Sequence, residues 1–242
     1  MSEPWIDIDG ASDNDMLLIA DHASNHVPDD IELGVPTAVM GEHVALDIGV
    51  APLAERLCAH LGCAAILGGV SRLLIDLNRE EDAAGLIPVV SDGYVIPGNA
   101  DLSAAHRAVR IARYWQPYHD HIAECVSTDQ PKLLISLHSF TPRLATSDAD
   151  RPWQIGILYN DDDRAARLAL PLLEQAGIVA GDNLPYSGKV LNATMNRHAE
   201  ANGIPYLGIE VRQDLIPDHT GVIGWAERLA PIIRTVRNGL KP

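Results

Sequence analysis

The chain has 242 residues, 47% of them hydrophobic, and its 33 acidic against 18 basic side chains give a formal net charge of -15. This acidic excess repels nucleic acid and anionic lipid, so neither is an expected partner. The length suits one α/β domain over residues 1–242, and its oligomeric state is left open. The three cysteines lack Cys-x-x-Cys spacing, and neither a leader nor an eighteen-residue apolar run is found. These features predict a cytoplasmic protein with reduced thiols.

Short apolar runs alternate with longer segments of helical period, as in βα units around a mostly parallel sheet. In chain order, the expected strands are Met16–Asp21, Cys63–Leu67, Leu73–Leu77, Leu133–Leu137, Ile155–Tyr159 and Tyr206–Val211. The expected helices are Val39–Leu61, Ser103–Val126, Asp163–Ala176, Ala193–Asn202 and Gly221–Gly239. This order predicts a three-layer α/β/α sandwich with a mixed, mostly parallel sheet.

Polar side chains lie at the end of three of the expected strands. His22 and His138 each follow an apolar run, and Glu210 lies near the end of another. Open α/β sheets bind ligands at the carboxyl ends of their strands, so these three side chains are expected at one edge. A single histidine there would most simply be structural, but two histidines with a glutamate indicate a site.

Two neutral imidazoles, one carboxylate and an open position are what a catalytic zinc requires. His22 and His138 supply two ligands, and Asp47, expected on the first long helix, is the preferred third. Asn25, three residues after His22, is the rival, although its uncharged amide oxygen is a weaker ligand. Asp47 could instead simply pair with His43, four residues earlier. The sequence therefore predicts one Zn2+ per chain, with another divalent ion possible.

Hydrolysis of an amide also needs a base that takes a proton from water and later protonates the leaving amine. Glu210, partly desolvated on an apolar strand, fits this role. Arg212 shares its face of the strand and is expected to contact substrate, unless it merely pairs with Glu210. Ser139 is a further candidate for substrate contact. It is not expected to be a nucleophile, because neighbours on a strand face opposite ways and no Gly-x-Ser-x-Gly motif occurs.

The segment Ser71–Arg79 offers two arginines and an asparagine around one short apolar run. Arg72 could stabilise a tetrahedral oxyanion, while Asn78 and Arg79 could hold a substrate carboxylate. The alternative is a strand flanked by solvated charges. No P-loop or dinucleotide fingerprint is present, so no organic cofactor is expected.

Taken together, these residues resemble the N-formylglutamate amidohydrolase family. The matching segments are Asp21-His22-Ala23-Ser24-Asn25, His43-Val44-Ala45-Leu46-Asp47-Ile48-Gly49, Ser71-Arg72-Leu73-Leu74-Ile75-Asp76-Leu77-Asn78-Arg79, Leu137-His138-Ser139-Phe140-Thr141-Pro142 and Ile209-Glu210-Val211-Arg212-Gln213-Asp214-Leu215. The resemblance implies a fold like that of zinc carboxypeptidases and aspartoacylase, with a carboxylate-binding Asn-Arg pair. It also implies hydrolysis of N-formyl-L-glutamate to formate and L-glutamate, and a place in histidine degradation.

One departure from the related zinc sites concerns the third ligand. Those sites use a His-x-x-Glu motif, whereas this chain has His22-Ala23-Ser24-Asn25. The leading prediction is a zinc-dependent amidohydrolase acting on a small anionic N-acyl amino acid. A peptidase or amidase of the same fold acting on peptides is the second hypothesis. A carboxylate-binding protein that has lost its metal, suggested by Asn25, is the third.

Overall fold

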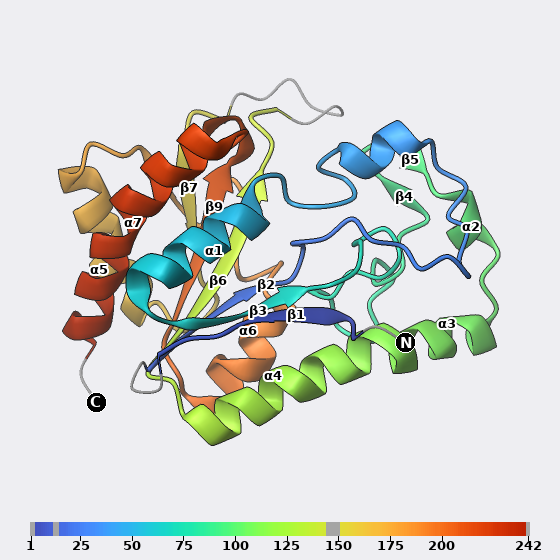
Figure 1. The fold of residues 1–242 in the computed structure, drawn as a ribbon, viewed down its shortest axis with the longest axis horizontal. Coiled ribbons are helices and arrows are strands. Elements are labelled where there is room, and N and C mark those ends of the chain that lie inside the picture. The colour runs from blue at the N-terminus through green and yellow to red at the C-terminus, as the bar shows by residue number, and fades with distance from the viewer. Residues whose placement is uncertain (1–2, 12–14, 144–150, 241–242) are drawn as a thin grey trace.

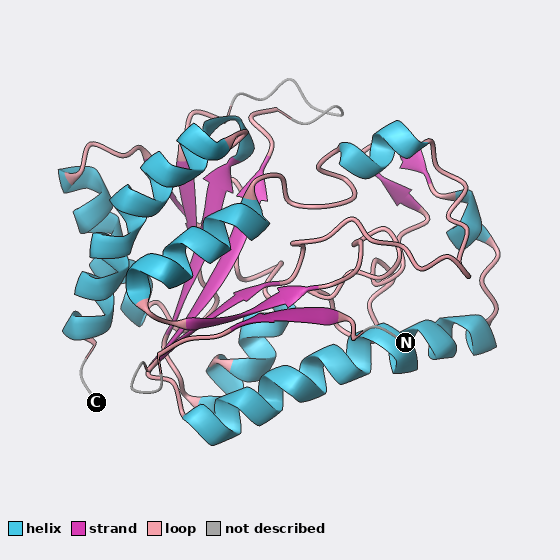
Figure 2. Cartoon of the chain, viewed as in Figure 1, coloured by secondary structure: helices cyan, strands magenta, loops and turns pink. Residues whose placement is uncertain are grey.

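The computed structural model describes residues 3–11, 15–143 and 151–240, and its centre is a seven-stranded mixed sheet with helices on both faces (Figures 1 and 2). The strands of this sheet are β1 (Trp5–Ile8), β2 (Met16–Ala20), β3 (Ala64–Gly68), β6 (Leu133–Phe140), β7 (Ile155–Leu158), β8 (Ala180–Asp182) and β9 (Tyr206–Arg212). A separate hairpin joins β4 (Val90–Ser91) to β5 (Tyr94–Val95).

The strand order is β1-β3-β2-β6-β9-β7-β8. Four neighbouring pairs are parallel, and β1 with β3 and β7 with β9 are antiparallel. The sheet is therefore mixed and mostly parallel, which confirms the predicted architecture. The edge strands β1 and β8 were not anticipated, because both are short and β1 is largely exposed.

Two sets of helices cover the sheet. The helices are α1 (Val50–Leu61), α2 (Pro97–Ala100), α3 (Ala104–Arg110), α4 (Gln116–Asp129), α5 (Arg164–Gln175), α6 (Ala193–His198) and α7 (His219–Gly239). Side chains of α1, α5 and α7 share one apolar core with the sheet, and those of α4 and α6 share another. Figure 1 shows the two sets on opposite sides of the strands. No helix in the described ranges is long and apolar enough to cross a membrane.

The expected helix over residues 39–61 is only partly right. A 3-10 turn occupies Thr37–Gly41, an irregular stretch follows, and α1 begins at Val50. Gly49 has a φ of 81°, and a Cβ there would lie 2.3 Å from the carbonyl oxygen of Ile216. Only glycine suits this left-handed, crowded position, which ends the irregular stretch and starts the helix. Asp47 consequently lies before α1 and not on it.

The expected strand over residues 73–77 is wrong, since this buried segment forms turns. Its carbonyl groups bond to side chains instead of a neighbouring strand. Asn99 Nδ2 donates to the oxygen of Leu73 at 2.8 Å, Arg110 donates to that of Leu74 at 3.1 Å, and His119 Nε2 lies 3.0 Å from that of Leu77. A short apolar run cannot be distinguished by periodicity from a buried segment of another kind.

Alternation along β6 and β9 determines which side chains face the functional site. Leu137 and Ile209 belong to the core under α1, α5 and α7. Their neighbours His138 and Glu210 therefore face the opposite side of the sheet, and they are paired directly across the parallel ladder. Both lie near the carboxyl ends of their strands.

Candidate active site

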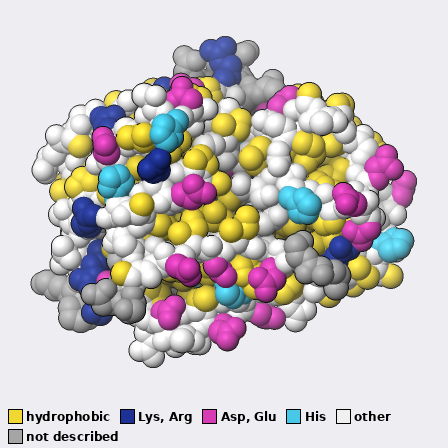
Figure 3. All heavy atoms as spheres, in the orientation of Figure 1, with side chains coloured by type: hydrophobic (Ala, Val, Ile, Leu, Met, Phe, Trp, Pro, Cys, Tyr) yellow, Lys and Arg dark blue, Asp and Glu magenta, His cyan; other side chains and the backbone are white. Residues whose placement is uncertain are grey.

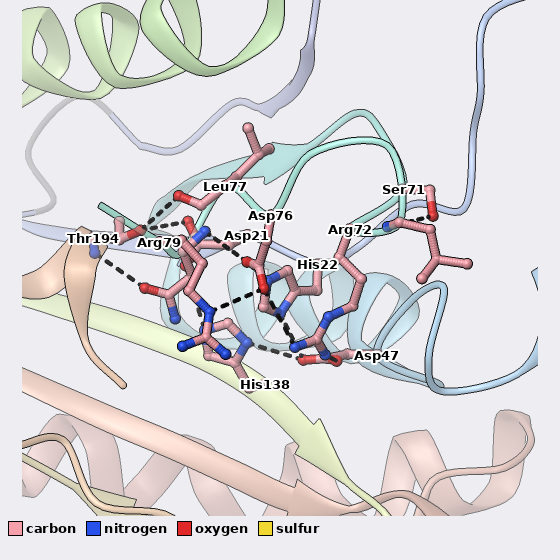
Figure 4. Close-up of polar contacts among 12 residues, drawn as sticks. Asp21, His22, Asp47, Ser71, Arg72, Asp76, Leu77, Arg79, His138 and Thr194 are labelled. Atoms are coloured by element: carbon pink, nitrogen blue, oxygen red, sulfur yellow. Dashed lines mark hydrogen bonds and ion pairs between the residues drawn. The ribbon is translucent and has the colours of Figure 1, made fainter. Parts of the chain in front are cut away.

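Two histidines and one aspartate converge at the carboxyl edge of the sheet (Figure 4). His22 follows β2, His138 lies on β6, and Asp47 is in the irregular stretch before α1. Asp47 Oδ2 is 2.9 Å from His138 Nδ1 and 3.5 Å from His22 Nδ1. The peptide N–H of Asp47 also donates to the carbonyl oxygen of His22 at 2.9 Å, which ties this stretch to the end of β2.

A second carboxylate lies behind each histidine. His22 Nε2 is 2.6 Å from Asp76 Oδ1, and His138 Nε2 is 3.4 Å from Asp21 Oδ2. The other oxygen of Asp21 accepts hydrogen bonds from the Tyr118 hydroxyl at 2.8 Å and from Thr194 Oγ1 at 2.9 Å. Such carboxylates fix the orientation of histidines that bind metals.

This donor set fits a divalent metal ion. One ligand atom from each of His22, Asp47 and His138 lies within 4.8 Å of the others, and all three residues are buried. His22 Nδ1 has no hydrogen-bond partner among the described residues, although it is buried. Two imidazoles and a carboxylate are ligands that zinc and similar ions accept. These three residues could therefore hold a metal ion between them.

Without an ion, the acidic neighbours favour protonated imidazoles. Burial and Arg72 lower the pKa of His22, but Asp76 and Asp47 outweigh them and raise it. Burial also opposes protonation of His138, yet Asp21 and Asp47 raise its pKa well above the ordinary value. A metal ion must displace these protons, so its binding is coupled to proton release.

Glu210 is the buried carboxyl beside this group. Its side chain lines the same cavity as the three residues, and its Oε2 is buried without a partner in the described ranges. Burial raises the pKa of Glu210 to about 8, against the opposing effects of His138 and Arg72. A carboxyl with such a pKa can both take up and release a proton near neutral pH.

Arg72 is held at the metal group by two carboxylates. Its guanidinium donates to Asp47 Oδ1 at 3.0 Å and forms an ion pair with Asp76 Oδ2 at 3.6 Å. Arg79 approaches Asp76 Oδ2 through Nε at 3.4 Å, and about a third of its side chain is exposed. Figure 4 shows both arginines directed towards the two histidines. They place two positive charges beside a buried acidic cluster.

A cavity of about 170 Å³ encloses these groups and is called the main cavity below. It includes His22, Asp47, Arg72, Asn78, Arg79, His138, Ser139 and Glu210, eight of the nine residues predicted from the sequence. Ser139 contributes differently from the prediction: its backbone N–H donates to Asp47 Oδ2, and its hydroxyl donates to the carbonyl oxygen of Ile48.

Two candidates from the sequence lie elsewhere. Arg212 does not line the main cavity; it pairs with Asp214 at 2.7 Å and approaches two backbone carbonyl oxygens. Asn25 donates through Nδ2 to the carbonyl oxygen of Met40 at 2.7 Å and lines a different surface depression. The structure therefore places Asp47, and not Asn25, with the two histidines.

Several residues of this region were not among the site residues predicted from the sequence. Asp21 and Asp76 orient the histidines, and their positions at the ends of apolar runs were a usable signal. His43 and Tyr186 also line the main cavity, and His43 Nδ1 is 3.7 Å from Asp47 Oδ1. This distance is longer than a hydrogen bond, and His43 Nδ1 has no hydrogen-bond partner among the described residues, so the structure brings the two side chains close without pairing them. Burial lowers the pKa of His43 to about 4, so this imidazole is neutral near pH 7.

The surface of the molecule agrees with its acidic composition. Figure 3 shows acidic side chains dispersed over one face, with most of the basic ones visible there on its left side. The two half-buried arginines of the main cavity are a local exception in an acidic molecule.

Comparisons with known proteins agree on one family. Residues 14–217 match the family model for N-formylglutamate amidohydrolase. The gene product Atu2144 from Agrobacterium tumefaciens is similar in structure with a TM-score of 0.93 and 30% identity, covering 98% of this chain and 96% of that one. An N-formylglutamate amidohydrolase from Ralstonia eutropha JMP134 shares the fold with a TM-score of 0.78 and 20% identity, covering 99% and 100%. No curated protein matches the sequence. With a family match over most of its length, the chain belongs to the N-formylglutamate amidohydrolase family.

Proposed function

We propose that this hydrolase cleaves the N-acyl amide of a small anionic amino acid, most concretely N-formyl-L-glutamate, with a divalent ion held by His22, Asp47 and His138. One observation carries the proposal: a desolvated carboxyl, Glu210, lies across the strand ladder from His138 in the same enclosed cavity as this group. The family and the small cavity support a substrate the size of one amino acid.

Zinc is the proposed ion. When bound, it supplies a Lewis acid that polarises an amide carbonyl and makes water a better nucleophile. The protein's contribution is to hold the ligands in one orientation. Asp76 and Asp21 do this for the imidazoles, while Ser139 and Arg72 do it for the Asp47 carboxylate.

Proton transfer falls to Glu210. In its ionised form this carboxylate accepts a proton from the attacking water, and in its protonated form it donates that proton to the leaving amine. Arg72 offers its positive charge to the oxyanion that develops as the carbonyl carbon becomes tetrahedral. Because Asp47 and Asp76 already fix the guanidinium, little reorientation is needed during the reaction.

Substrate orientation is proposed to come from Asn78 and Arg79. The guanidinium of Arg79 has donors beyond its Nε, and these suit the α-carboxylate of the substrate. Asn78 is fixed by two contacts: its backbone N–H donates to Asp76 Oδ1, and its Oδ1 accepts from the N–H of Thr194. These contacts support a pair of donors held at a constant distance from the metal group.

The test combines metal content with formate release. The protein is purified without added metal, its zinc is measured per chain, and formate release from N-formyl-L-glutamate is followed before chelation, after chelation and after zinc return. About one zinc per chain with reversible loss of activity is expected. Zinc with cleavage of short peptides but no formate release would instead favour a peptidase, and no zinc uptake would favour the binding protein.

A further inference from the structure

A second depression, here called the side pocket, adjoins the main cavity. It has a volume of about 120 Å³, and it shares Asn78, Arg79 and Asn192 with the main cavity. The rest of its wall is formed by Glu80, Ala83, Val190, Ala193 and Asn196. A substrate held at the metal group can therefore extend past Arg79 into a pocket with three carboxamide side chains.

The network behind the pocket fixes the orientation of two of these carboxamides. A Glu200 carboxylate oxygen can only accept, so the Asn160 group 3.0 Å from it is the NH2, and this NH2 also donates to Asn196 Oδ1 at 3.3 Å. The Tyr206 hydroxyl gives its hydrogen to Glu200 at 3.0 Å and accepts from Asn192 Nδ2 at 2.8 Å. The nitrogen of Asn192 and the oxygen of Asn196 therefore both point into this network.

The third carboxamide is fixed from the other side. Asn78 Oδ1 accepts the backbone N–H of Thr194 at 3.1 Å, so its NH2 points away from that contact. One atom of each carboxamide consequently remains without a partner among the described residues: the donors Asn78 Nδ2 and Asn196 Nδ2, and the acceptor Asn192 Oδ1. Two donors and one acceptor complement a carboxamide, whereas a carboxylate can only accept.

From this pattern we infer that the side pocket binds an uncharged amide at the far end of the substrate side chain. The enzyme then deformylates N-formyl-L-glutamine, or an N-formylglutamate whose side-chain carboxyl is amide-linked, as well as N-formyl-L-glutamate itself. This rests on the proposed function. In the reaction, N-formyl-L-glutamine and water give formate and L-glutamine. The side-chain amide lies in the side pocket and is not cleaved.

The experiment compares side chains on the zinc-loaded enzyme. Formate release is measured with N-formyl-L-glutamine, N-formyl-L-glutamate, N-formyl-γ-L-glutamylglycine and N-formyl-L-alanine. The expected kcat/KM for N-formyl-L-glutamine and for N-formyl-γ-L-glutamylglycine exceeds that for N-formyl-L-alanine by at least about tenfold. This is the scale of one added hydrogen bond. Of the two amides, faster cleavage of the glutamylglycine derivative would identify the amide-linked form as the preferred source.

Variants at Asn196 test the donor directly. Asn196→Ala is expected to lower the ratio of kcat/KM for N-formyl-L-glutamine to that for N-formyl-L-alanine by about tenfold. Asn196→Asp keeps an oxygen that accepts from Asn160 and Asn192, but it presents a second, negatively charged oxygen to the side pocket. It should therefore lower kcat/KM for N-formyl-L-glutamate more than kcat/KM for N-formyl-L-glutamine. Asn238→Ala, at an exposed asparagine on α7, is the control and should change no ratio.

Two results would overturn the inference. The first is that Asn196→Ala leaves unchanged the ratio of kcat/KM for N-formyl-L-glutamine to that for N-formyl-L-alanine. The second is that the wild-type enzyme prefers N-formyl-L-glutamate to N-formyl-L-glutamine and that Asn196→Ala abolishes this preference. Binding of free L-glutamine and L-alanine by calorimetry separates this inference from the proposed function. Tighter binding of glutamine that weakens in Asn196→Ala, with no formate release from any compound, keeps the side pocket and rejects the reaction.

Discussion

The two walls of the main cavity are held in different ways. His138 and Glu210 stand opposite each other on β6 and β9, where seven residue pairs continue the ladder from Leu134 with Tyr206 to Phe140 with Arg212. The facing wall, residues 71–79, has no strand partner and depends on donors from remote side chains. The ladder fixes the backbone of its residues, so the facing wall is expected to be displaced more readily by single substitutions outside the cavity.

The largest expected effect is on the ladder wall, at Glu210. Glu210→Gln keeps the shape but removes proton transfer, so kcat should fall by about 10²- to 10⁴-fold. Zinc content should stay close to wild type, because the residue is not among the proposed ligands. Steady-state formate release with metal analysis measures this. Glu227→Gln, at an exposed position on α7, is the matched control. Retention of wild-type kcat by Glu210→Gln would reject Glu210 as the base.

The carboxylates behind the histidines provide the next comparison, since Asp76 belongs to the facing wall and Asp21 contacts His138 of the ladder wall. Asp76→Asn removes the charge 2.6 Å from His22 Nε2, and Asp21→Asn removes the charge 3.4 Å from His138 Nε2. Each should weaken zinc binding by about 10- to 100-fold. Asp76→Asn should have the larger effect, because Asp76 also pairs with Arg72 and Arg79.

Competition with a chelator of known affinity measures both variants. Asp82→Asn, at an exposed carboxylate in the loop after Arg79, serves as the control and should bind zinc like the wild type. Equal affinities for Asp76→Asn and wild type would contradict the role of Asp76 in orienting His22.

The difference between the walls also explains what the sequence could predict. His22, His138 and Glu210 were found because each lies at or near the end of an apolar run, and the sheet brings such ends together. Asp47 was correctly grouped with them although the expected helix was wrong, because its own peptide N–H bonds to the end of β2. Local pattern was sufficient for His138 and Glu210, which are paired across the ladder.

The facing wall could not be predicted in the same way. Its carbonyl groups bond to Asn99, Arg110 and His119, which lie 26, 36 and 42 residues further along the chain. No local pattern relates an apolar run to donors at such distances, so the run was interpreted as a strand. Arg212 was expected at the site because alternation places it on the face of Glu210, but its contact with Asp214 holds it outside the main cavity.

A smaller effect is expected where the facing wall is anchored. Arg110 is buried and donates to the carbonyl oxygen of Leu74 and to Asn99 Oδ1. Arg110→Gln should cost about 1–3 kcal/mol of unfolding free energy, because it leaves buried acceptors unpaired. Since the wall carries Asn78 and Arg79, the KM for the substrate should rise severalfold while zinc content is unchanged.

Urea unfolding and steady-state kinetics test this anchoring. Arg113→Gln, one turn further on and paired with Asp30 at the surface, is the control and should change stability by no more than about 1 kcal/mol. If Arg110→Gln loses stability but keeps a wild-type KM, Arg110 supports the fold without positioning the substrate-binding wall.

The smallest expected effect concerns the pH dependence of stability on the ladder wall. In the chelated protein, the pKa of Glu210 is raised by burial to about 8, while in the unfolded chain it returns to its ordinary value near 4.5. Between these values the folded state keeps a proton that the unfolded state loses, so this group makes folding less favourable as pH rises from about 4.5 to 8. His138 acts in the same direction, because its pKa in the folded state is also raised.

Glutamine cannot ionise, so Glu210→Gln removes only the Glu210 part of this dependence. At pH 5 the chelated variant and chelated wild type should melt at similar temperatures, since a protonated glutamate and a glutamine are alike in charge and shape. At pH 8.5 the variant should be more stable by about 1 kcal/mol or more, roughly 2–4 °C in Tm per kcal/mol for a chain of this size. Parallel melting curves across this pH range would mean that Glu210 is already ionised in the folded protein. The ladder would then hold the carboxyl in a more polar setting than its burial indicates, and proton delivery to the leaving amine would need another donor from the main cavity.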